Sequence, residues 1–451
     1  MHVKGLFTLL CLPLVLGGCG QDSSASKSQS GSKPVFVDEN GMSYLQYDDG
    51  WHLVDYRGKD KNVIVPENKT IEGITLNVTQ IESHAFYGRS VLEGIEVPST
   101  VTYIGDSAFV GTNLSTFYGS VNLEYVASNA FDETPYLKNE NGPILYLPSK
   151  DNPYCIAYKQ LSIPNRYNAP SSIERVLDNV FERASFSEDN PVFPSLKYIG
   201  RQSFYSPNVA YTMTFPEAIE VGDEAFAQFA GTAISLPKVE TLGDHVFESD
   251  DFLDEIYLPK TLRSIGKEIF RYCYEVKNIS VPFLGPSAEE PKGISYLFGD
   301  LSEVEGSAFE EYKLVLDRLT IGGGKIVQHA LEKNVGVKKL VFENIETIPT
   351  YAFEGHSELA EVILLNGAKR IDYGAFSGHR ISSVYIPTTV SYLGERAFYS
   401  AYAFDMSFGY TSAAIEAGVS VGIEYHVSAY DVGDNCTLHY NVTNPYKGMT
   451  Y

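Results

Sequence analysis

Histidine is the residue type in this chain that most readily suggests a metal or acid–base site, and nine histidines are present. His84, His245 and His329 each stand two residues before a recurring Phe or Leu, whereas His356 and His379 each stand three residues after one. The last two form a possible two-histidine metal site on neighbouring turns, but no carboxylate pattern completes a ligand set. A histidine that recurs at one position of a repeat is more simply a surface or packing residue. The sequence therefore predicts no metal site.

A glycine-rich segment, Gly322-Gly323-Gly324-Lys325, has a superficial similarity to a phosphate-binding loop. Such a loop has four residues between its glycines and a Ser or Thr after the Lys, whereas Ile326 follows here. A tight turn after the strand at 319–321 is the simpler interpretation. No Gly-x-Ser-x-Gly elbow, His-Glu-x-x-His pair or catalytic Cys signature occurs in the sequence. We therefore expect no cofactor and no enzymatic activity.

Acidic residues gather in one segment that invites a calcium hypothesis. They lack the Asp-x-Asp-x-Asp-Gly spacing of a calcium loop, so the sequence predicts a solvated, charged loop instead. The residues concerned are Glu248, Asp250, Asp251, Asp254 and Glu255.

The cysteines provide neither a disulfide framework nor a Cys-x-x-Cys metal pair. Cys11 and Cys19 lie in the N-terminal segment described below. Cys155, Cys273 and Cys436 are far apart in the sequence and are predicted to be small buried hydrophobic residues.

The charge of the chain argues against nucleic acid as a partner. Its 451 residues include 34 Lys and Arg but 57 Asp and Glu, a formal net charge of −23. Nucleic-acid binding requires clustered Lys and Arg that neutralise phosphates. Hydrophobic residues make up 44% of the chain, which is enough to form a folded core.

An internal repeat of about 22 residues determines where all of these residues lie. Its clearest copies are phrases such as Ile104-Gly105-Asp106-Ser107-Ala108-Phe109. The final Phe, which we call the anchor, returns in steps of 21 to 23 residues within three groups, and Leu331 fills the same slot 22 residues before Phe353. The anchors are Phe86, Phe109, Phe131, Phe181, Phe204, Phe226, Phe247, Phe270, Phe353, Phe376 and Phe398.

A second phrase follows each anchor by about 11 residues, for example Leu92-x-x-Ile95-x-Val97-Pro98. Its alternation indicates a short, half-buried strand that Pro terminates. The Gly before Ala-Phe, such as Gly105, is predicted to supply a positive φ. Because one unit cannot bury its own apolar face, stacked units should share a parallel sheet whose x positions line an exposed face.

This pattern resembles the BspA-like leucine-rich repeats of bacterial and protozoan surface proteins over about residues 77–400. The resemblance implies a right-handed solenoid with one short parallel strand per turn, used at the cell surface for adhesion or binding. The chain has no recurring Asn ladder position and no regular helix signal. An all-β-dominated leucine-rich-repeat solenoid with few or no long helices is therefore predicted, rather than an α/β horseshoe.

Two irregular units, 132–180 and 271–330, interrupt the repeat and are where binding specificity is expected. The first contains apolar runs at 144–147 and 156–158, which predict an inserted hairpin. The second contains Tyr296-Leu297-Phe298-Gly299, a phrase that resembles the family's longer units.

Both ends of the repeat are expected to carry caps, because an uncovered sheet edge invites aggregation. Residues 37–76 should form an N-terminal β cap with a hairpin that turns at Asp48-Asp49-Gly50. Residues 401–451 should form a C-terminal β cap or an appended β unit.

The N-terminal segment predicts the cellular location of the protein rather than part of its fold. Lys4, an apolar run and the ending Leu16-Gly17-Gly18-Cys19 resemble the signal peptide and lipobox of bacterial lipoproteins. This resemblance implies cleavage of residues 1–18, a diacylglycerol on Cys19, and a Ser-rich tether over 19–36. The protein would then face outward from the cell envelope and touch the membrane only through that lipid. An ordinary secretory signal with a chance Cys is the alternative.

Three functions remain open from the sequence. The first is a surface protein that binds a protein of the host, the matrix or a neighbouring cell. The second is an envelope carbohydrate-binding protein, because Tyr257 and Tyr385 occupy strand x positions where they could stack on sugars. The third and least favoured is an enzyme. A contiguous Tyr stripe would favour sugars, a broad mixed surface would favour a protein, and a deep polar cleft would favour an enzyme.

Overall fold

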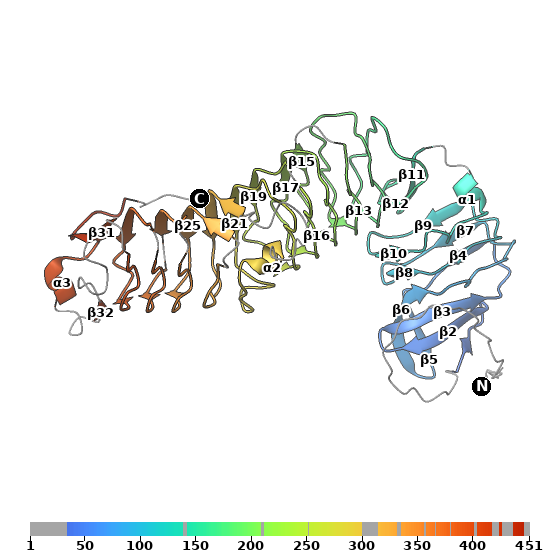
Figure 1. Ribbon diagram of the computed structural model, residues 1–451. Coiled ribbons are helices and arrows are strands. Elements are labelled where there is room, and N and C mark those ends of the chain that lie inside the picture. The colour runs from blue at the N-terminus through green and yellow to red at the C-terminus, as the bar shows by residue number, and fades with distance from the viewer. Residues whose placement is uncertain are drawn as a thin grey trace, which may run out of the picture. The chain divides into compact units, whose positions relative to one another are not determined.

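The computed structural model forms two compact units, Met1–Leu161 and Ser162–Tyr451 (Figure 1). Cys19, His356, His379 and Asp251 lie outside the residues that the structure describes. The described residues are 34–138, 142–208, 212–250, 252–299, 314–331, 335–355, 358–365, 367–378, 380–400, 404–416, 424–425 and 436–445.

The first unit opens with the predicted hairpin. Strands β2 (Met42–Tyr47) and β3 (Gly50–Tyr56) pair antiparallel around the turn at Asp48 and Asp49, and β1 (Phe36–Val37) adds to β2. Trp51 is buried, and its indole N–H donates to the carbonyl of Lys69 at 3.0 Å. Strand β3 then pairs in parallel with β6 (Ile74–Ile81), so the hairpin continues directly into the repeat.

Parallel strands follow in two ladders of the first unit. One contains β6, β8 (Tyr103–Ile104) and β10 (Tyr125–Val126), with β5 (Asn68–Ile71) paired antiparallel to β6. The other contains β4 (Asn62–Ile64), β7 (Gly94–Glu96) and β9 (Thr116–Tyr118). After α1 (Pro135–Lys138), strands β11 (Ile144–Leu147) and β12 (Ile156–Gln160) form an antiparallel pair, which confirms the inserted hairpin.

The second unit is a parallel β-solenoid. Its turns contain the strand that the sequence predicted, and many turns also contain a second, shorter strand. The longer strands β19, β21, β25 and β31 run along one side, with β32 and α2 on the opposite side (Figure 1). The longer strands are β15 (Thr212–Thr214), β17 (Ala233–Ser235), β19 (Glu255–Tyr257), β21 (Asn278–Val281), β23 (Arg318–Ile321), β25 (Lys339–Phe342), β27 (Glu361–Leu364), β29 (Ser383–Ile386), β31 (Phe404–Phe408) and β33 (Cys436–His439).

The shorter strands contain two residues each and stack in ladders of their own. They are β13 (Arg175–Val176), β14 (Tyr198–Ile199), β16 (Glu220–Val221), β18 (Thr241–Leu242), β20 (Ser264–Ile265), β26 (Thr347–Ile348), β28 (Arg370–Ile371), β30 (Tyr392–Leu393) and β32 (Glu424–Tyr425). A further parallel pair joins β22 (Leu314–Leu316) to β24 (Val335–Val337), and the helices α2 (Ser295–Phe298) and α3 (Ser412–Glu416) are short.

The anchors form a stack of aromatic rings inside the turns. All eleven are at most 2% exposed. Consecutive rings are nearly parallel, as in Phe376 and Phe398, whose centroids are 4.9 Å apart, and Phe226 and Phe247, at 6.1 Å. These spacings are close to the separation of adjacent β-strands, so each turn adds one ring to the stack.

Backbone hydrogen bonds join the turns beside this stack. In the turn of Phe226, the amides of Glu224, Phe226 and Gln228 donate to carbonyls of the next turn at 2.8–3.0 Å. Glu224 and Gln228 have left-handed φ values of 53° and 57°, whereas Phe226 between them has no positive φ. A positive φ recurs at the position two residues before the anchor slot. The residues with a positive φ there include His84, Ser107, Asn179, Gln202, Glu224, His245, Glu268, His329, Tyr351, Gly374 and Arg396.

The role predicted for the repeat glycine is therefore wrong. The positive φ falls two residues before the anchor, mostly on residues other than glycine, whereas Gly105 and Gly222 have no such φ. A Cβ on Gly105 would lie 2.5 Å from the amide nitrogen of Ser83, and one on Gly222 would lie 2.8 Å from that of Arg201. Glycine is required because two turns approach closely, not because of an unusual backbone conformation.

The position after that glycine, which follows Leu177 rather than Gly in the turn of Phe181, contributes a ladder that the sequence analysis did not recognise. Oδ1 of Asp178, Asp223 and Asp244 accepts the amide of Arg201, Asp244 and Lys267 respectively, at 2.8–2.9 Å. Each carboxylate thus satisfies an amide of the next turn. Asp, rather than a recurring Asn, makes these bonds between turns.

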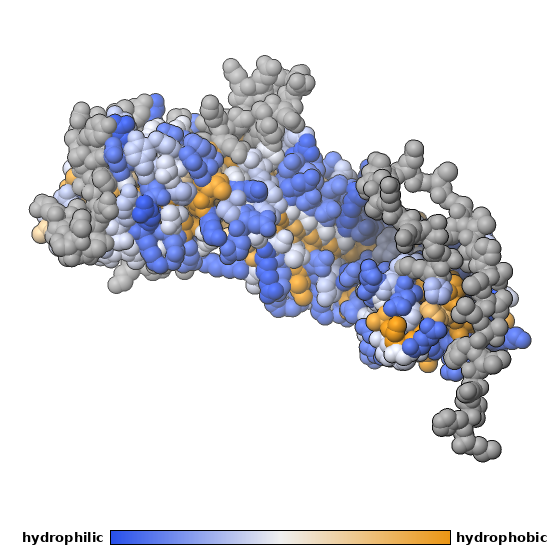
Figure 2. Space-filling model, turned by 90° about the horizontal axis from the view of Figure 1, so that it is seen from below, coloured by the Kyte–Doolittle hydropathy of each residue, from blue (hydrophilic) through white to orange (hydrophobic). Residues whose placement is uncertain are grey.

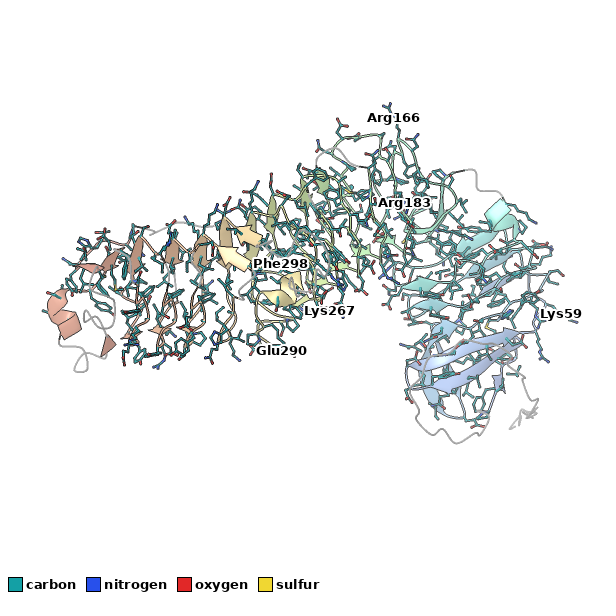
Figure 3. The ribbon with its side chains drawn as sticks, in the orientation of Figure 1. Lys59, Arg166, Arg183, Lys267, Glu290 and Phe298 are labelled. Carbon is teal, nitrogen blue, oxygen red and sulfur yellow. The ribbon has the colours of Figure 1, made fainter. Side chains whose placement is uncertain are left out.

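The aromatic stack continues into the irregular unit 271–330. Phe298, at the end of α2, is buried and lies 5.6 Å from Phe270, ring centroid to centroid (Figure 3). The amide of Phe270 donates to the carbonyl of Leu297 at 2.8 Å, as an anchor does in a regular turn. Phe298 is therefore a further anchor, which a step of 28 residues concealed from the 22-residue pattern.

Truncating an anchor should be costly, whereas changing a strand terminator should not. We expect Phe226→Ala to lower the free energy of unfolding by about 3–5 kcal/mol, because it leaves a cavity between two stacked rings. Pro259→Ala is the matched control and should change it by roughly 0.5 kcal/mol or less. Denaturant unfolding of both variants measures the difference. An unchanged midpoint for Phe226→Ala would contradict the anchoring role.

Candidate binding surface

The strand ladder from β19 to β33 presents two rows of outward-pointing side chains. The first row is polar and charged along its length. Within it, Lys339 Nζ lies 3.2 Å from Glu361 Oε2, and Asn278 Nδ2 donates to Glu255 Oε1 at 3.2 Å. The row consists of Glu255, Asn278, Arg318, Lys339, Glu361, Ser383, Asp405 and Thr437.

The second row is exposed only at its ends, which corrects the expectation that all x positions line an open face. Tyr257 is 53% exposed, but Thr320, Val341 and Ile363 are almost completely buried. Val341 and Ile363 belong to one apolar cluster with Leu365. The row consists of Tyr257, Ser280, Thr320, Val341, Ile363, Tyr385, Ser407 and His439.

Tyr385 is also buried, so its predicted role as an exposed sugar platform is wrong. It is 5% exposed, and its hydroxyl donates to the carbonyl of Val442 at 3.4 Å. Gly409 contributes to this burial, because a Cβ there would lie 2.6 Å from the Tyr385 hydroxyl. The C-terminal segment therefore packs against this end of the strand face.

Tyr257 stands at the centre of an exposed polar and aromatic cluster. Its hydroxyl donates to Glu255 Oε2 at 3.2 Å and accepts a hydrogen bond from Arg318 Nη2 at 2.9 Å. Asn278 completes the group, which spans β19, β21 and β23 and which we call the Tyr257 cluster. Phe252, just before β19, is 60% exposed. Tyrosine, arginine and other aromatic residues are the types that most often dominate binding energy in protein interfaces.

Other partly exposed tyrosines occupy the short-strand ladders, where neighbours cover one face of each ring. Tyr103 and Tyr125 stack on each other at 4.8 Å. Arg175 lies 4.0 Å from the ring centroid of Tyr198, and Arg370 lies 3.8 Å from that of Tyr392. These rings stack along the solenoid rather than presenting an uncovered stripe for a sugar.

The surrounding surface is hydrophilic and carries charges of both signs. Figure 2, which views the molecule from below and so from the side away from β19 and β31 in Figure 1, shows a face dominated by hydrophilic residues, with separate apolar patches. Lysines pair with acids of the adjacent turn, as in Lys238–Glu217 at 2.6 Å and Lys338–Asp317 at 2.7 Å. Exposed pairs of this kind stabilise a fold by only about 0–1 kcal/mol, so their main effect is on the surface potential.

The glycine-rich segment forms the turn that was predicted after the strand. Residues 322–325 bend away after β23, with φ of +77° at Gly324, and Lys325 Nζ pairs with Glu289 Oε2 at 2.9 Å.

The acidic segment is only partly the solvated loop that was predicted. Asp250 is fully buried and accepts the amide of Phe229 at 2.5 Å, so the prediction is wrong for this residue. Asp254 is exposed and lies 3.6 Å from Lys277 Nζ. Among the described residues, no group of three or more His, Cys, Asp or Glu could hold a metal ion.

The cysteine prediction holds for two of the three positions. Cys155 and Cys273 are 2% exposed, and the Cys273 thiol donates to the carbonyl of Phe247 at 2.8 Å. Cys436, on β33, is only half-buried. Burial nevertheless raises the pKa of its thiol to about 11, which makes it a poor nucleophile at neutral pH.

A comparison with family models identifies the repeat. The model of the BspA type leucine-rich repeat region matches residues 67–185, 174–285 and 296–407, in six copies. The chain belongs to this family. BspA-type repeats thus account for the ladders described above. Separately, none of the helices in the described residues is long and apolar enough to cross a membrane.

Solved structures of bacterial leucine-rich repeat proteins are also similar over most of the chain. A protein from Bacteroides ovatus is 16% identical and covers 92% of this chain and 100% of its own, with a TM-score of 0.27. A leucine-rich cell surface protein from Faecalibacterium prausnitzii is 15% identical over 90% and 99%, with a TM-score of 0.24. The pneumococcal vaccine antigen PcpA is 15% identical over 91% and 88%, also with a TM-score of 0.24. Among curated proteins, none matches the chain.

The two acids at Asp250 and Asp254 should respond very differently to mutation. Asp250→Ala leaves the buried amide of Phe229 without its acceptor, so we expect a loss of about 1–3 kcal/mol in the free energy of unfolding. Asp254→Ala removes only an exposed ion pair and should change it by about 0–1 kcal/mol. Urea unfolding of the two variants provides the measurement. Equal effects would mean that Asp250 does not act as a structural acceptor.

Proposed function

We propose that this BspA-type repeat protein is a lipid-anchored, extracellular-facing binding protein whose ligand is another protein. The Tyr257 cluster carries the proposal. It joins an exposed tyrosine and a carboxylate of β19 to an arginine of β23 in one hydrogen-bonded group on the strand face. Such a group is fixed before binding, so little conformational entropy is lost when a partner covers it.

The character of the surface supports a protein ligand over a glycan. The strand face is a broad mixture of acids, bases and amides, and aromatic residues form only part of it. Tyr385 is buried, and the tyrosines of the short-strand ladders have one ring face covered. A carbohydrate-binding protein remains the alternative, with the exposed ring of Tyr257 as its observation. The proposed function is binding alone and includes no catalytic step.

Selective treatment of cell surfaces separates these two ligands. The purified protein is incubated with host cells or neighbouring bacterial cells that have been treated with protease or with periodate. A protein ligand predicts that protease abolishes binding and periodate does not, whereas the reverse result would favour a glycan. Binding to cells after both treatments would contradict the proposal.

The Tyr257 cluster should dominate that binding. We expect Tyr257→Ala to weaken binding at least about tenfold, because central interface tyrosines typically contribute more than 1 kcal/mol. Lys369→Ala is the matched control, since it removes an exposed residue whose Nζ pairs with Glu346 at 2.6 Å away from the cluster. Equal binding by both variants would move the site elsewhere on the solenoid.

Membrane attachment requires a separate test at Cys19. We expect Cys19→Ala to move the protein from the membrane fraction to the soluble fraction, because the proposed lipid is its sole attachment. Fractionation of cells that express each form measures this. If the variant still sediments with membranes, the lipid-anchor proposal is wrong, whatever the cell-binding result.

A further inference from the structure

His52 lies between two carboxylates at the junction of the N-terminal hairpin and the first repeat turn. The side chain is on β3, and the residue is 5% exposed. Its Nδ1 is 2.7 Å from Glu82 Oε1, and its Nε2 is 2.9 Å from Asp49 Oδ1. Asp49 belongs to the turn of the hairpin, whereas Glu82 directly follows β6. The imidazole therefore bridges two segments that are 33 residues apart in sequence.

Only the protonated ring can make both contacts as hydrogen bonds. An imidazolium has two N–H donors, whereas neutral imidazole has one donor and one acceptor. In the neutral state, one ring nitrogen would present a lone pair to a carboxylate at 2.7–2.9 Å. Such a contact is unfavourable because the lone pair and the carboxylate repel each other, and the buried imidazole cannot turn away, although the Asp49 and Glu82 side chains are 49% and 32% exposed.

The surroundings hold this arrangement in place. The ring of Tyr47, on β2, stacks on the imidazole at 4.0 Å with an interplanar angle of 16°. Asp49 is held from β6, where Gln80 Nε2 donates to its Oδ2 at 3.0 Å and Thr79 Oγ1 does so at 3.3 Å. Both bonds also join the hairpin to the repeat.

The titration properties of the cluster agree with this geometry. Burial acts to lower the pKa of His52, but the hydrogen bonds and charges of Glu82 and Asp49 outweigh it and raise the pKa above its usual 6.5. Burial acts to raise the pKa of Asp49, but its bonds to His52 and Gln80 outweigh it and lower the pKa. The pKa of Tyr47 is raised by burial and by Glu82 and Asp49, so this ring stays neutral. Beyond Glu82 lie Tyr103, whose pKa is also raised by burial, and Asp106.

We propose that His52 is a proton-dependent clamp that fastens the N-terminal hairpin to the first repeat turn. Its contribution is complete below the usual histidine pKa and is lost as the pH rises through the higher pKa of the folded state. On the acid side, Asp49 contributes above its usual carboxyl pKa, and that contribution disappears as the pH falls through its lowered value. The clamp therefore holds at pH values below the usual histidine pKa of 6.5 and above the usual carboxyl pKa, and it loosens as the pH rises through the raised pKa of His52. A loosened hairpin leaves the first turn of the repeat less protected.

Hydrogen exchange tests the clamp in the intact protein. Peptides that cover the hairpin, residues 42–56, and the segment 74–82 are compared between about pH 5.5 and about pH 9, after correction for intrinsic exchange rates. In the parent, protection of the hairpin should fall about tenfold at the higher pH for each unit by which the His52 pKa is raised. In His52→Gln the pH difference should vanish, because glutamine does not titrate. His245→Gln, which changes a histidine in the second unit, should behave as the parent does.

A second measurement does not depend on a variant that folds well. With histidine labelled at Cε1, an NMR titration of the parent reports the pKa of His52 directly, and His52→Gln is needed only to assign the signal. We expect a midpoint above 6.5. A midpoint at or below the usual histidine value, or equal hairpin protection at both pH values in the parent, would overturn the proposal.

Discussion

The structure depends on the separation between successive turns. Each turn must lie one strand spacing from the last, because the anchor rings stack and the backbone amides bond to carbonyls of the next turn. The same spacing allows the anchor rings to stack in the apolar interior and the backbone groups of adjacent turns to form hydrogen bonds. It also explains why a unit of about 22 residues tolerates insertions between turns but keeps Phe298 on the stack after a longer step.

Several sequence features follow from that spacing. Gly222 is present because a side chain there would collide with the turn that contains Arg201. Asp223 follows it because a short carboxylate accepts the amide of Asp244 on the next turn. Glu224 then takes a left-handed φ, and its amide also donates to a carbonyl of the next turn. The phrase that ends in Phe226 is thus a set of contacts between turns, each with a different physical cause.

Most of the fold could be predicted from the sequence, because the repeat places the same residue types at the same depth many times. The anchors, the alternating strands and both hairpins were apparent from local patterns. Contacts between distant segments could not be predicted in this way. Tyr385 is buried by a segment 57 residues later, and Arg318 reaches Tyr257 across 61 residues that include an irregular unit. Neither pairing leaves a periodic signal, so the sequence indicated Tyr257 as a candidate binding residue but not its contact with Arg318.

The central claim is that each turn is stabilised by its neighbours through the stacked anchor rings. Hydrogen exchange of Phe376→Ala tests it most directly, because Phe376 lies between Phe353 and Phe398 and stacks on both. The account predicts lost protection in the turns of these three residues and unchanged protection around Phe204. Protection that falls equally across the second unit, or that does not fall at all, would contradict it.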